Sequence, residues 1–68
     1  MSLGLLLRRY RVKHKLSIRE AAEKLGVFPG NLSRYEGDEN IMSFEIAIRI
    51  SEVYKIPLGI MKKAFFKE

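Results

Sequence analysis

The sequence predicts a compact all-α domain built from five short helices. Apolar residues recur at helical spacing in five segments, Ser, Gly and Pro residues stand where helices begin and end, and no segment alternates with period two for long enough to form a strand. We expect residues 1–68, the whole chain, to form a single domain, because no linker or repeat divides them. A domain of this size buries only about 60% of its unfolded surface, so its stability depends on tight packing or on oligomerisation.

The first helix is predicted over residues 3–14. Its inner face is formed by four residues at helical spacing, Leu3, Leu6, Leu7 and Tyr10. His14 is the only histidine of the chain and lies at the end of this helix. There we expect a surface imidazole that interacts with the helix C-terminus, rather than a metal ligand or a general base.

The second helix is predicted over residues 18–25. Ser17 and Glu20 have the spacing of a capping box, which starts a helix. Four apolar residues then follow at i, i+3, i+4 and i+7, namely Ile18, Ala21, Ala22 and Leu25. Gly26 comes directly afterwards and can adopt the positive φ that ends a helix.

A third helix is predicted over residues 29–36, with Pro29 in its first turn and with Leu32 and Tyr35 facing inward. Residues 17–36 therefore contain two short helices joined by a very short glycine turn. Helices joined so closely must cross steeply. This arrangement is typical of a helix-turn-helix, which places its second helix in the major groove of DNA.

A fourth helix is predicted over residues 44–54 with Ser43 as its cap, and a fifth over residues 58–66 after an interruption at Pro57. The core face of the fourth helix is expected to comprise Phe44, Ala47, Ile48 and Ser51.

The fourth helix also carries a second apolar row, and a helix that is apolar on two faces is buried on two faces. The fifth helix brings more apolar area than one short helix needs. We therefore predict a symmetric homodimer with an interface formed by Ile46, Ile50, Val53, Ile60, Met61, Phe65 and Phe66. The alternative is that all of these residues pack within one chain.

Positive charge is concentrated in the first half of the chain. Residues 1–35 carry eight Lys and Arg residues against two Glu, a net charge of +6, whereas residues 36–68 carry five against six acidic residues, a net charge of −1. The basic half contains the predicted helix-turn-helix. A local positive field attracts polyanions, which favours nucleic acid as a partner over the alternative of a solubilising surface.

Several classes of protein are excluded by what the sequence lacks. The chain has no cysteine, so neither disulfides nor a thiolate metal site can stabilise it. Its first residues do not have the order of charged and apolar residues found in signal peptides, and no segment is long and apolar enough to span a membrane. No nucleophile–base pair, carboxylate cluster or phosphate-binding glycine loop is present. We therefore expect a cytoplasmic protein that is not an enzyme and that needs no cofactor, metal or small-molecule ligand.

Four groups of residues give the chain a resemblance to a known family. They are Leu7, Arg8 and Arg11, then Leu16 and Ser17, then residues 22–27 (AEKLGV), and finally residues 32–36 (LSRYE). Over residues 3–58 the chain resembles the lambda-repressor-like helix-turn-helix family of phage repressors, Cro proteins and small prokaryotic regulators. The resemblance implies a five-helix domain that binds duplex DNA, often as a homodimer on a near-palindromic operator.

The same resemblance implies an ion pair between Arg11 and Glu36. Each of these residues follows an inward tyrosine, Tyr10 or Tyr35, so both lie beside the core. A planar guanidinium can hold a carboxylate through two parallel hydrogen bonds. We expect this pair to be structural and to have no catalytic role.

The residues expected to contact DNA fall into two groups. The base contacts are assigned to Asn31, Ser33 and Arg34, which face outward when Leu32 and Tyr35 face inward. Arg34 is the main candidate because arginine can bond both acceptors of a guanine edge, although the alternative is a phosphate contact. Contacts with the DNA backbone, which position a protein without reading sequence, are assigned to Arg9, Ser17, Ile18, Arg19, Gly30 and Asn40.

Some positions depart from the family pattern. Pro29 and Gly30 occupy the start of the third helix, where polar side chains usually meet bases, and Ile18 replaces a common glutamine. Phe28 replaces a small polar cap. We expect Phe28 to pack against Leu32 as a hydrophobic staple, with contact to a thymine methyl group as the alternative.

Asp38 and Glu39 place negative charge after the third helix, where the family often has basic residues near phosphate. Together these departures predict either a narrow base readout or the loss of DNA binding. The alternative function is a helix-turn-helix module of antitoxin or adaptor type, which would bind a protein through the apolar surface of the fourth and fifth helices.

Overall fold

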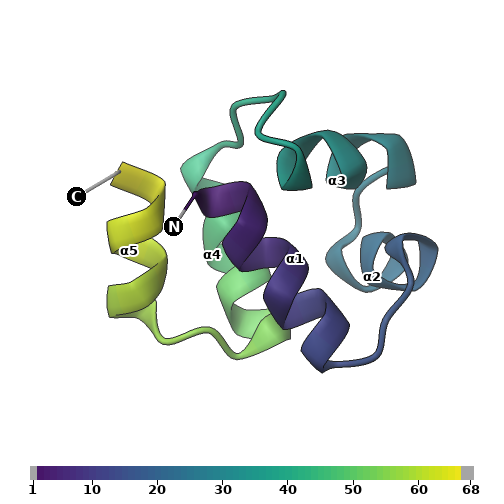
Figure 1. Cartoon of the computed structure of the whole chain (residues 1–68), viewed down its shortest axis with the longest axis horizontal. Helices are drawn as coiled ribbons and strands as arrows, with labels where there is room; N and C mark the ends of the chain where they lie inside the picture. Colours follow the sequence, from purple (N-terminus) through teal and green to yellow (C-terminus); the bar gives the residue numbers. More distant parts are fainter. Residues whose placement is uncertain (1, 67–68) are drawn as a thin grey trace.

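The computed structural model describes residues 2–66, and all of the regular structure in this range is helical. In chain order the helices are α1 (Leu3–Lys13), α2 (Ile18–Leu25), α3 (Pro29–Glu36), α4 (Phe44–Tyr54) and α5 (Leu58–Phe66) (Figure 1). The predicted all-α class and the five helices are confirmed, and four helices have the predicted bounds. α1 ends one residue earlier than expected, because His14 leaves the helical conformation and is its C-cap.

Serine side chains begin three of the helices. The hydroxyl oxygens of Ser2 and Ser43 each accept a hydrogen bond from the backbone N–H of the third residue of the following helix, at 3.1 and 3.2 Å. Ser17 and Glu20 form the predicted capping box, and Gly26 ends α2 with a φ of 72°. Each serine cap satisfies an amide that has no partner within its own helix.

α1 crosses the centre of the molecule and packs against α3 on one side and α5 on the other (Figure 1). α2 packs against α3 and α4, and α4 packs against α5. The largest fully buried side chains of the common core are Leu7, Leu25, Leu32, Ile50 and Tyr54. Along the longest axis of the molecule, α5 lies at one end, and α2 lies with the start of α3 at the other (Figure 1).

α1 and α3 come unusually close at Gly4. A Cβ atom at this position would collide with the carbonyl oxygens of Tyr35 and Glu36 at the end of α3. The Gly4 N–H also donates a hydrogen bond to Oδ1 of Asp38 (2.9 Å). The negative charge that the sequence placed near DNA phosphate therefore caps the N-terminus of α1, where the helix dipole favours it.

The face of α4 that enters the core differs in part from the prediction. Ala47 and Ser51 are buried as predicted. Phe44 and Ile48, which the sequence places in the core, are 47% and 37% exposed, whereas Ile50 is buried. Ile50 and Met61, two residues predicted for the dimer interface, are buried in the core of the chain itself and are not available to a partner. The physical reason is that α4 is apolar around most of its circumference, so residue spacing alone does not select the buried face.

The side chain of His14 interacts with the C-terminal end of α4 rather than with that of its own helix. Its Nε2 donates a hydrogen bond to the carbonyl oxygen of Tyr54 (2.9 Å), and the two rings stack with their centroids 6.1 Å apart. The Tyr54 ring is fully buried, and its hydroxyl finds no hydrogen-bond partner among the described residues. Burial raises the pKa of Tyr54 to about 12.

Candidate nucleic-acid interface

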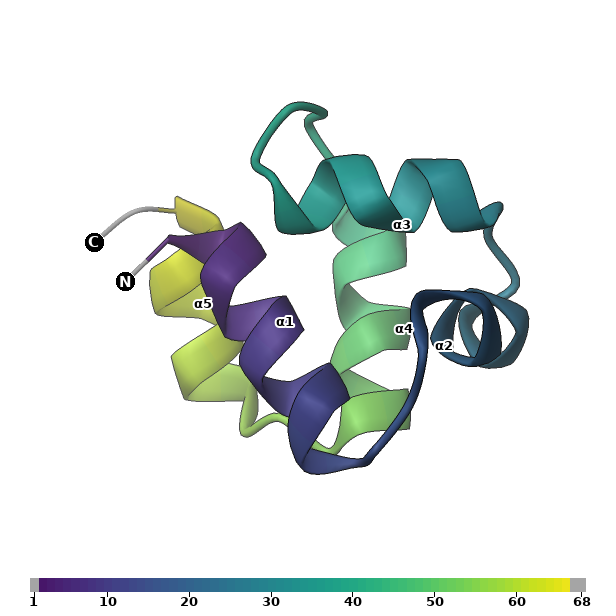
Figure 2. The same ribbon diagram turned by 45° about the vertical axis from the view of Figure 1, so that its right-hand side comes forward.

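α2 and α3 form a compact helix-turn-helix. Only residues 26–28 separate them. Gly26 adopts the left-handed conformation (φ 72°, ψ 30°), and the side chain of Val27 packs against the core. Figure 2 shows α2 nearly end-on and α3 side-on, so the two helices cross steeply and α3 lies at the periphery of the molecule.

An ion pair fixes the C-terminal end of α3 to α1. Arg11 Nε lies 2.7 Å from Glu36 Oε2, and Arg11 Nη2 lies 3.1 Å from Glu36 Oε1, so the pair is bidentate. Arg11 Nη1 donates to the carbonyl oxygen of Leu16 (2.8 Å) and so also holds the connection between α1 and α2. The Arg11 and Glu36 side chains are only 13% and 7% exposed. Hydrogen bonding to Glu36 raises the pKa of Arg11, so the guanidinium stays protonated.

The exposed face of α3 presents few side chains that can bind bases. Gly30, Ser33 and Arg34 are related by helical spacing, and all three are exposed. Asn31, the other predicted base contact, is half-buried. Within α3, Arg34 is the only exposed residue with a long polar side chain.

The N-terminus of α2 offers less to a phosphate than the sequence suggests. The Ser17 N–H donates to Glu20 Oε1 (2.9 Å), and the Ser17 hydroxyl oxygen accepts from the Glu20 N–H (3.0 Å). The hydrogen bond from the Ser17 backbone is the main cause of a lowered Glu20 pKa, so a carboxylate occupies this end of α2. A phosphate contact from the Ser17 amide would therefore compete with the capping box.

Four other residues assigned to DNA backbone contacts differ in their positions. Ile18 packs its side chain against the core, whereas Arg19, one residue further into α2, is exposed. The amides of both residues lie in the first turn of α2, where no carbonyl of the helix can accept from them. Arg9 is exposed on α1, and Asn40 is exposed in the connection between α3 and α4, so neither belongs to the helix-turn-helix itself.

The residues that build this geometry follow the pattern of a known family. Residues 7–61, which include the whole of α2, α3 and α4, match the family model described as helix-turn-helix. The chain belongs to the lambda-repressor-like helix-turn-helix family. This is a family of non-enzymatic regulators.

Several curated relatives share the segment that contains the helix-turn-helix. A protein of Pyrococcus horikoshii named as an HTH-type transcriptional regulatory protein is 42% identical over 55 residues, which cover 81% of this chain and 18% of the relative. A similarly named protein of Thermococcus gammatolerans is 40% identical over 56 residues, covering 82% and 18% of the two chains. The HTH-type transcriptional regulator ImmR of Bacillus subtilis is 38% identical over 56 residues, covering 82% of this chain and 44% of ImmR. The chain thus spans less than half the length of each of these relatives, and no solved structure matches it significantly.

The start of α3 is unusual for a helix-turn-helix domain. Phe28 is the N-cap residue of α3, makes no side-chain hydrogen bond to the helix and is 76% exposed. The predicted staple between Phe28 and Leu32 is wrong, because Phe28 is itself the N-cap, one residue after the staple position, and its ring is 76% exposed. Val27 instead precedes the cap and packs against the core, and this is the position from which a hydrophobic staple acts.

A second exposed surface lies on α4 and α5, and we call it the α4–α5 apolar face. It consists of Phe44, Ile48, Leu58, Phe65 and Phe66. Three phenylalanine rings of this face contact one another. The centroid of the Phe44 ring lies 5.7 Å from that of Phe65 and 6.4 Å from that of Phe66, and the Phe65 and Phe66 centroids are 5.1 Å apart. The sequence did not place Phe44 or Ile48 on this surface.

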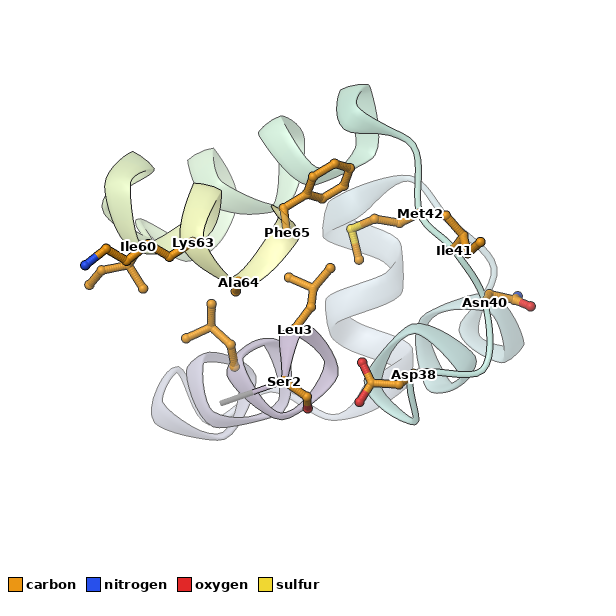
Figure 3. A pocket seen from close by; sticks show the side chains of 11 residues that line it. Ser2, Leu3, Asp38, Asn40, Ile41, Met42, Ile60, Lys63, Ala64 and Phe65 are labelled. Atoms are coloured by element: carbon orange, nitrogen blue, oxygen red, sulfur yellow. The ribbon is translucent and has the colours of Figure 1, made fainter. Parts of the chain in front are cut away.

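A groove of about 880 Å³ lies between the start of α1, the α3–α4 connection and α5 (Figure 3). Leu3, Met42 and Phe65 contribute to its apolar lining, and Asp38 stands at its edge.

The residues predicted for the dimer interface are divided among three environments. Ile60 and Phe66 are exposed, Ile46, Val53 and Phe65 are half-buried, and Ile50 and Met61 are buried.

Within residues 2–66, no group of three or more His, Cys, Asp or Glu side chains is placed to hold a metal ion. No helix in the same range is long and apolar enough to cross a membrane.

Proposed function

We propose that this chain binds duplex DNA sequence-specifically as a transcriptional regulator, by placing α3 in the major groove. The observation that carries the proposal is the exposed face of α3, which stands at the periphery of a helix-turn-helix and is held at its C-terminal end by the Arg11–Glu36 pair. The net charge of +6 on residues 1–35 supports it, since positive charge attracts DNA. The named relatives are HTH-type regulators over this same segment.

In this proposal only a few side chains of α3 recognise bases. Arg34 contacts a guanine edge, Ser33 contacts a base or a phosphate, and the half-buried Asn31 contributes less. Pro29 and Gly30 have no side chain that can hydrogen-bond to a base edge. Arg19 and the amides of the first turn of α2 bind the DNA backbone and set the position of the domain.

We further propose that the active form is a homodimer on a near-palindromic operator, joined through the α4–α5 apolar face. Exposed phenylalanine side chains in contact with one another form the kind of apolar patch that marks a protein interface. The domain is 29 Å long, and α5 lies at the end opposite to α2 and the start of α3 (Figure 1). Two domains joined at the α5 end would therefore hold their α3 helices apart on either side of the interface, as the two half-sites of an operator require.

Selection of bound sequences from random duplex DNA at moderate salt tests the proposal, and a near-palindromic site is the expected result. Arg34→Ala should then lose discrimination at one base pair of each half-site, about 5- to 150-fold per half-site. Arg19→Ala removes the same charge and is the matched control, since it should weaken all sequences alike and reduce the salt slope by about 1 per half-site. An unchanged base preference in Arg34→Ala would contradict the base contact.

Sedimentation at micromolar concentration, with and without the selected DNA, tests the dimer. Phe66→Glu places a charge in the α4–α5 apolar face and should give monomers, whereas Val12→Glu, at an exposed position of α1, should leave the dimer intact. A wild-type chain that is monomeric both free and on DNA would rule out the homodimer.

A protein-interaction module is the second candidate, because the α4–α5 apolar face is also suited to a different protein. Salt dependence separates the two functions. A DNA-binding dimer that neutralises about 6–8 phosphates should show a slope near −5 to −7 in a plot of log affinity against log salt. A protein-interaction module would show no DNA affinity even at low salt.

A further inference from the structure

The N-cap of α3 differs chemically from those of three other helices. α1, α2 and α4 each begin with a serine whose hydroxyl accepts a hydrogen bond from the helix. α3 begins with Phe28, which makes no such bond. Ser, Thr, Asn and Asp are the stabilising residues at this position, so a phenylalanine there does not serve the stability of α3.

Phe28 does not serve the core either. It is 76% exposed, and the neighbouring Val27 already packs against the core at the staple position. An aromatic ring that neither caps a helix nor fills a core has its apolar surface open to contact with another molecule.

The residues around Phe28 indicate which kind of molecule its exposed ring contacts. In a helix-turn-helix the first residues of the second helix approach the base edges in the major groove. Pro29 and Gly30 follow Phe28, both are exposed, and a Cβ atom added at Gly30 would meet nothing within 4 Å. This end of α3 is therefore slim enough for close approach and offers apolar contact in place of hydrogen bonds. The apolar group on the floor of the major groove is the C5 methyl of thymine.

We propose that Phe28 is a specificity-determining residue that packs on the C5 methyl group of one thymine in each half-site. The inference rests on the proposed DNA-binding function and adds a second base preference to that of Arg34. Phe28 discriminates by apolar contact and Arg34 by hydrogen bonding, so the two preferences respond to different changes in the DNA.

Deoxyuridine tests the contact, because it lacks only the methyl group and keeps the base-pairing edge of thymine. In the duplex selected by the wild-type chain, each thymine is replaced singly by deoxyuridine and the affinity is measured at fixed salt. Replacement of the contacted thymine should weaken binding about 4-fold per half-site, from the ~0.8 kcal/mol of one buried methyl-sized group. Replacement in both half-sites should weaken it about 15-fold, and all other replacements should have little effect.

Phe28→Ser is the decisive variant, because serine restores the N-cap chemistry of the other helices. It should raise the melting temperature and yet abolish the deoxyuridine penalty. Val12→Ala, which alters an exposed apolar residue of α1, should keep the penalty. The proposal is overturned if no replacement weakens the wild-type chain, or if the penalty persists in Phe28→Ser. Failure of the selection to yield any bound duplex would instead refute DNA binding itself, and the two failures are therefore distinguishable.

Discussion

Replacement of Arg11 by methionine tests how α3 is held in place. The substitution keeps an unbranched side chain but removes the guanidinium group, and with it both hydrogen bonds to the Glu36 carboxylate and the bond to the carbonyl oxygen of Leu16. The Glu36 carboxylate would lose its partner at a site where its side chain is only 7% exposed. The cost comes mainly from leaving that buried charge without a partner.

Breaking a buried ion pair in this way costs about 3–5 kcal/mol. A 68-residue domain has a total stability of roughly 3–10 kcal/mol, so the substitution removes a large share of it. At about 4–8 °C per kcal/mol for a domain of this size, the thermal midpoint of Arg11→Met should fall by at least about 12 °C.

Thermal and urea unfolding, followed by circular dichroism, measure this loss. Glu45→Gln is the matched control because Glu45 pairs with Arg49 at 3.8 Å on the surface, and such pairs contribute only about 0–1 kcal/mol. In a double-mutant cycle, the variant that combines Arg11→Met with Glu36→Leu should lose less stability than the sum of the losses of the two single variants, because neither charge is left buried without a partner. A loss for Arg11→Met no greater than that for Glu45→Gln would refute the reasoning.

Three other changes test the packing and the caps. Gly4→Ala should cost about 1–3 kcal/mol, because the added Cβ meets the Glu36 carbonyl oxygen; an unchanged thermal midpoint would show that α1 can move away from α3. Tyr54→Phe should keep or raise the midpoint at pH 7, because it removes a buried hydroxyl without a partner. Because the pKa of Tyr54 is raised, its contribution to wild-type stability is complete below pH 10.0 and is lost as the pH rises towards 12; a tyrosinate absorbance change near pH 12 that persists in Tyr54→Phe would contradict this assignment. Glu20 has a pKa lowered from 4.5 by the Ser17 hydrogen bonds, so its contribution is present above pH 4.5 and is lost as the pH falls through the lowered value. In urea unfolding Glu20→Gln should flatten this acid decline, and an identical pH profile would count against the capping box.

Helix bounds could be predicted from the sequence because local residues determine them. Ser17 and Ser43 precede helices, Gly26 ends one, and Pro29 fits the first turn of another, and in each case the structure agrees. Such signals act within one helical turn and do not depend on the rest of the chain.

Contacts between distant residues could not be predicted in this way. Asp38 looks like a charge in a polar loop until the fold brings it to the N-terminus of α1, 34 residues away, where it accepts from Gly4. Likewise the buried face of α4 depends on where α2 and α5 lie, so spacing within the helix selected Phe44 for the core when Ile50 is the buried residue.

The candidate site was predictable to the extent that it follows the family pattern. The Arg11–Glu36 pair was implied by the resemblance, and the structure contains it. The sequence left two roles open for Phe28, because an apolar residue at the start of a helix fits both a staple and an exposed ring, and the packing of Val27 decides between them. The assignments of Asn31, Ser33 and Arg34 to base contacts stay predictions.

α3 is held very differently at its two ends. Its last turn is pressed against the backbone of Gly4 and bonded to Arg11, whereas its first turn begins at Phe28 without a side-chain cap. The last turn is thus held by polar bonds to α1, whereas the first turn is held by the packing of Val27 and Leu32. In the proposed complex with DNA, Arg34 would therefore extend from the firmly held end of α3, two residues before Glu36.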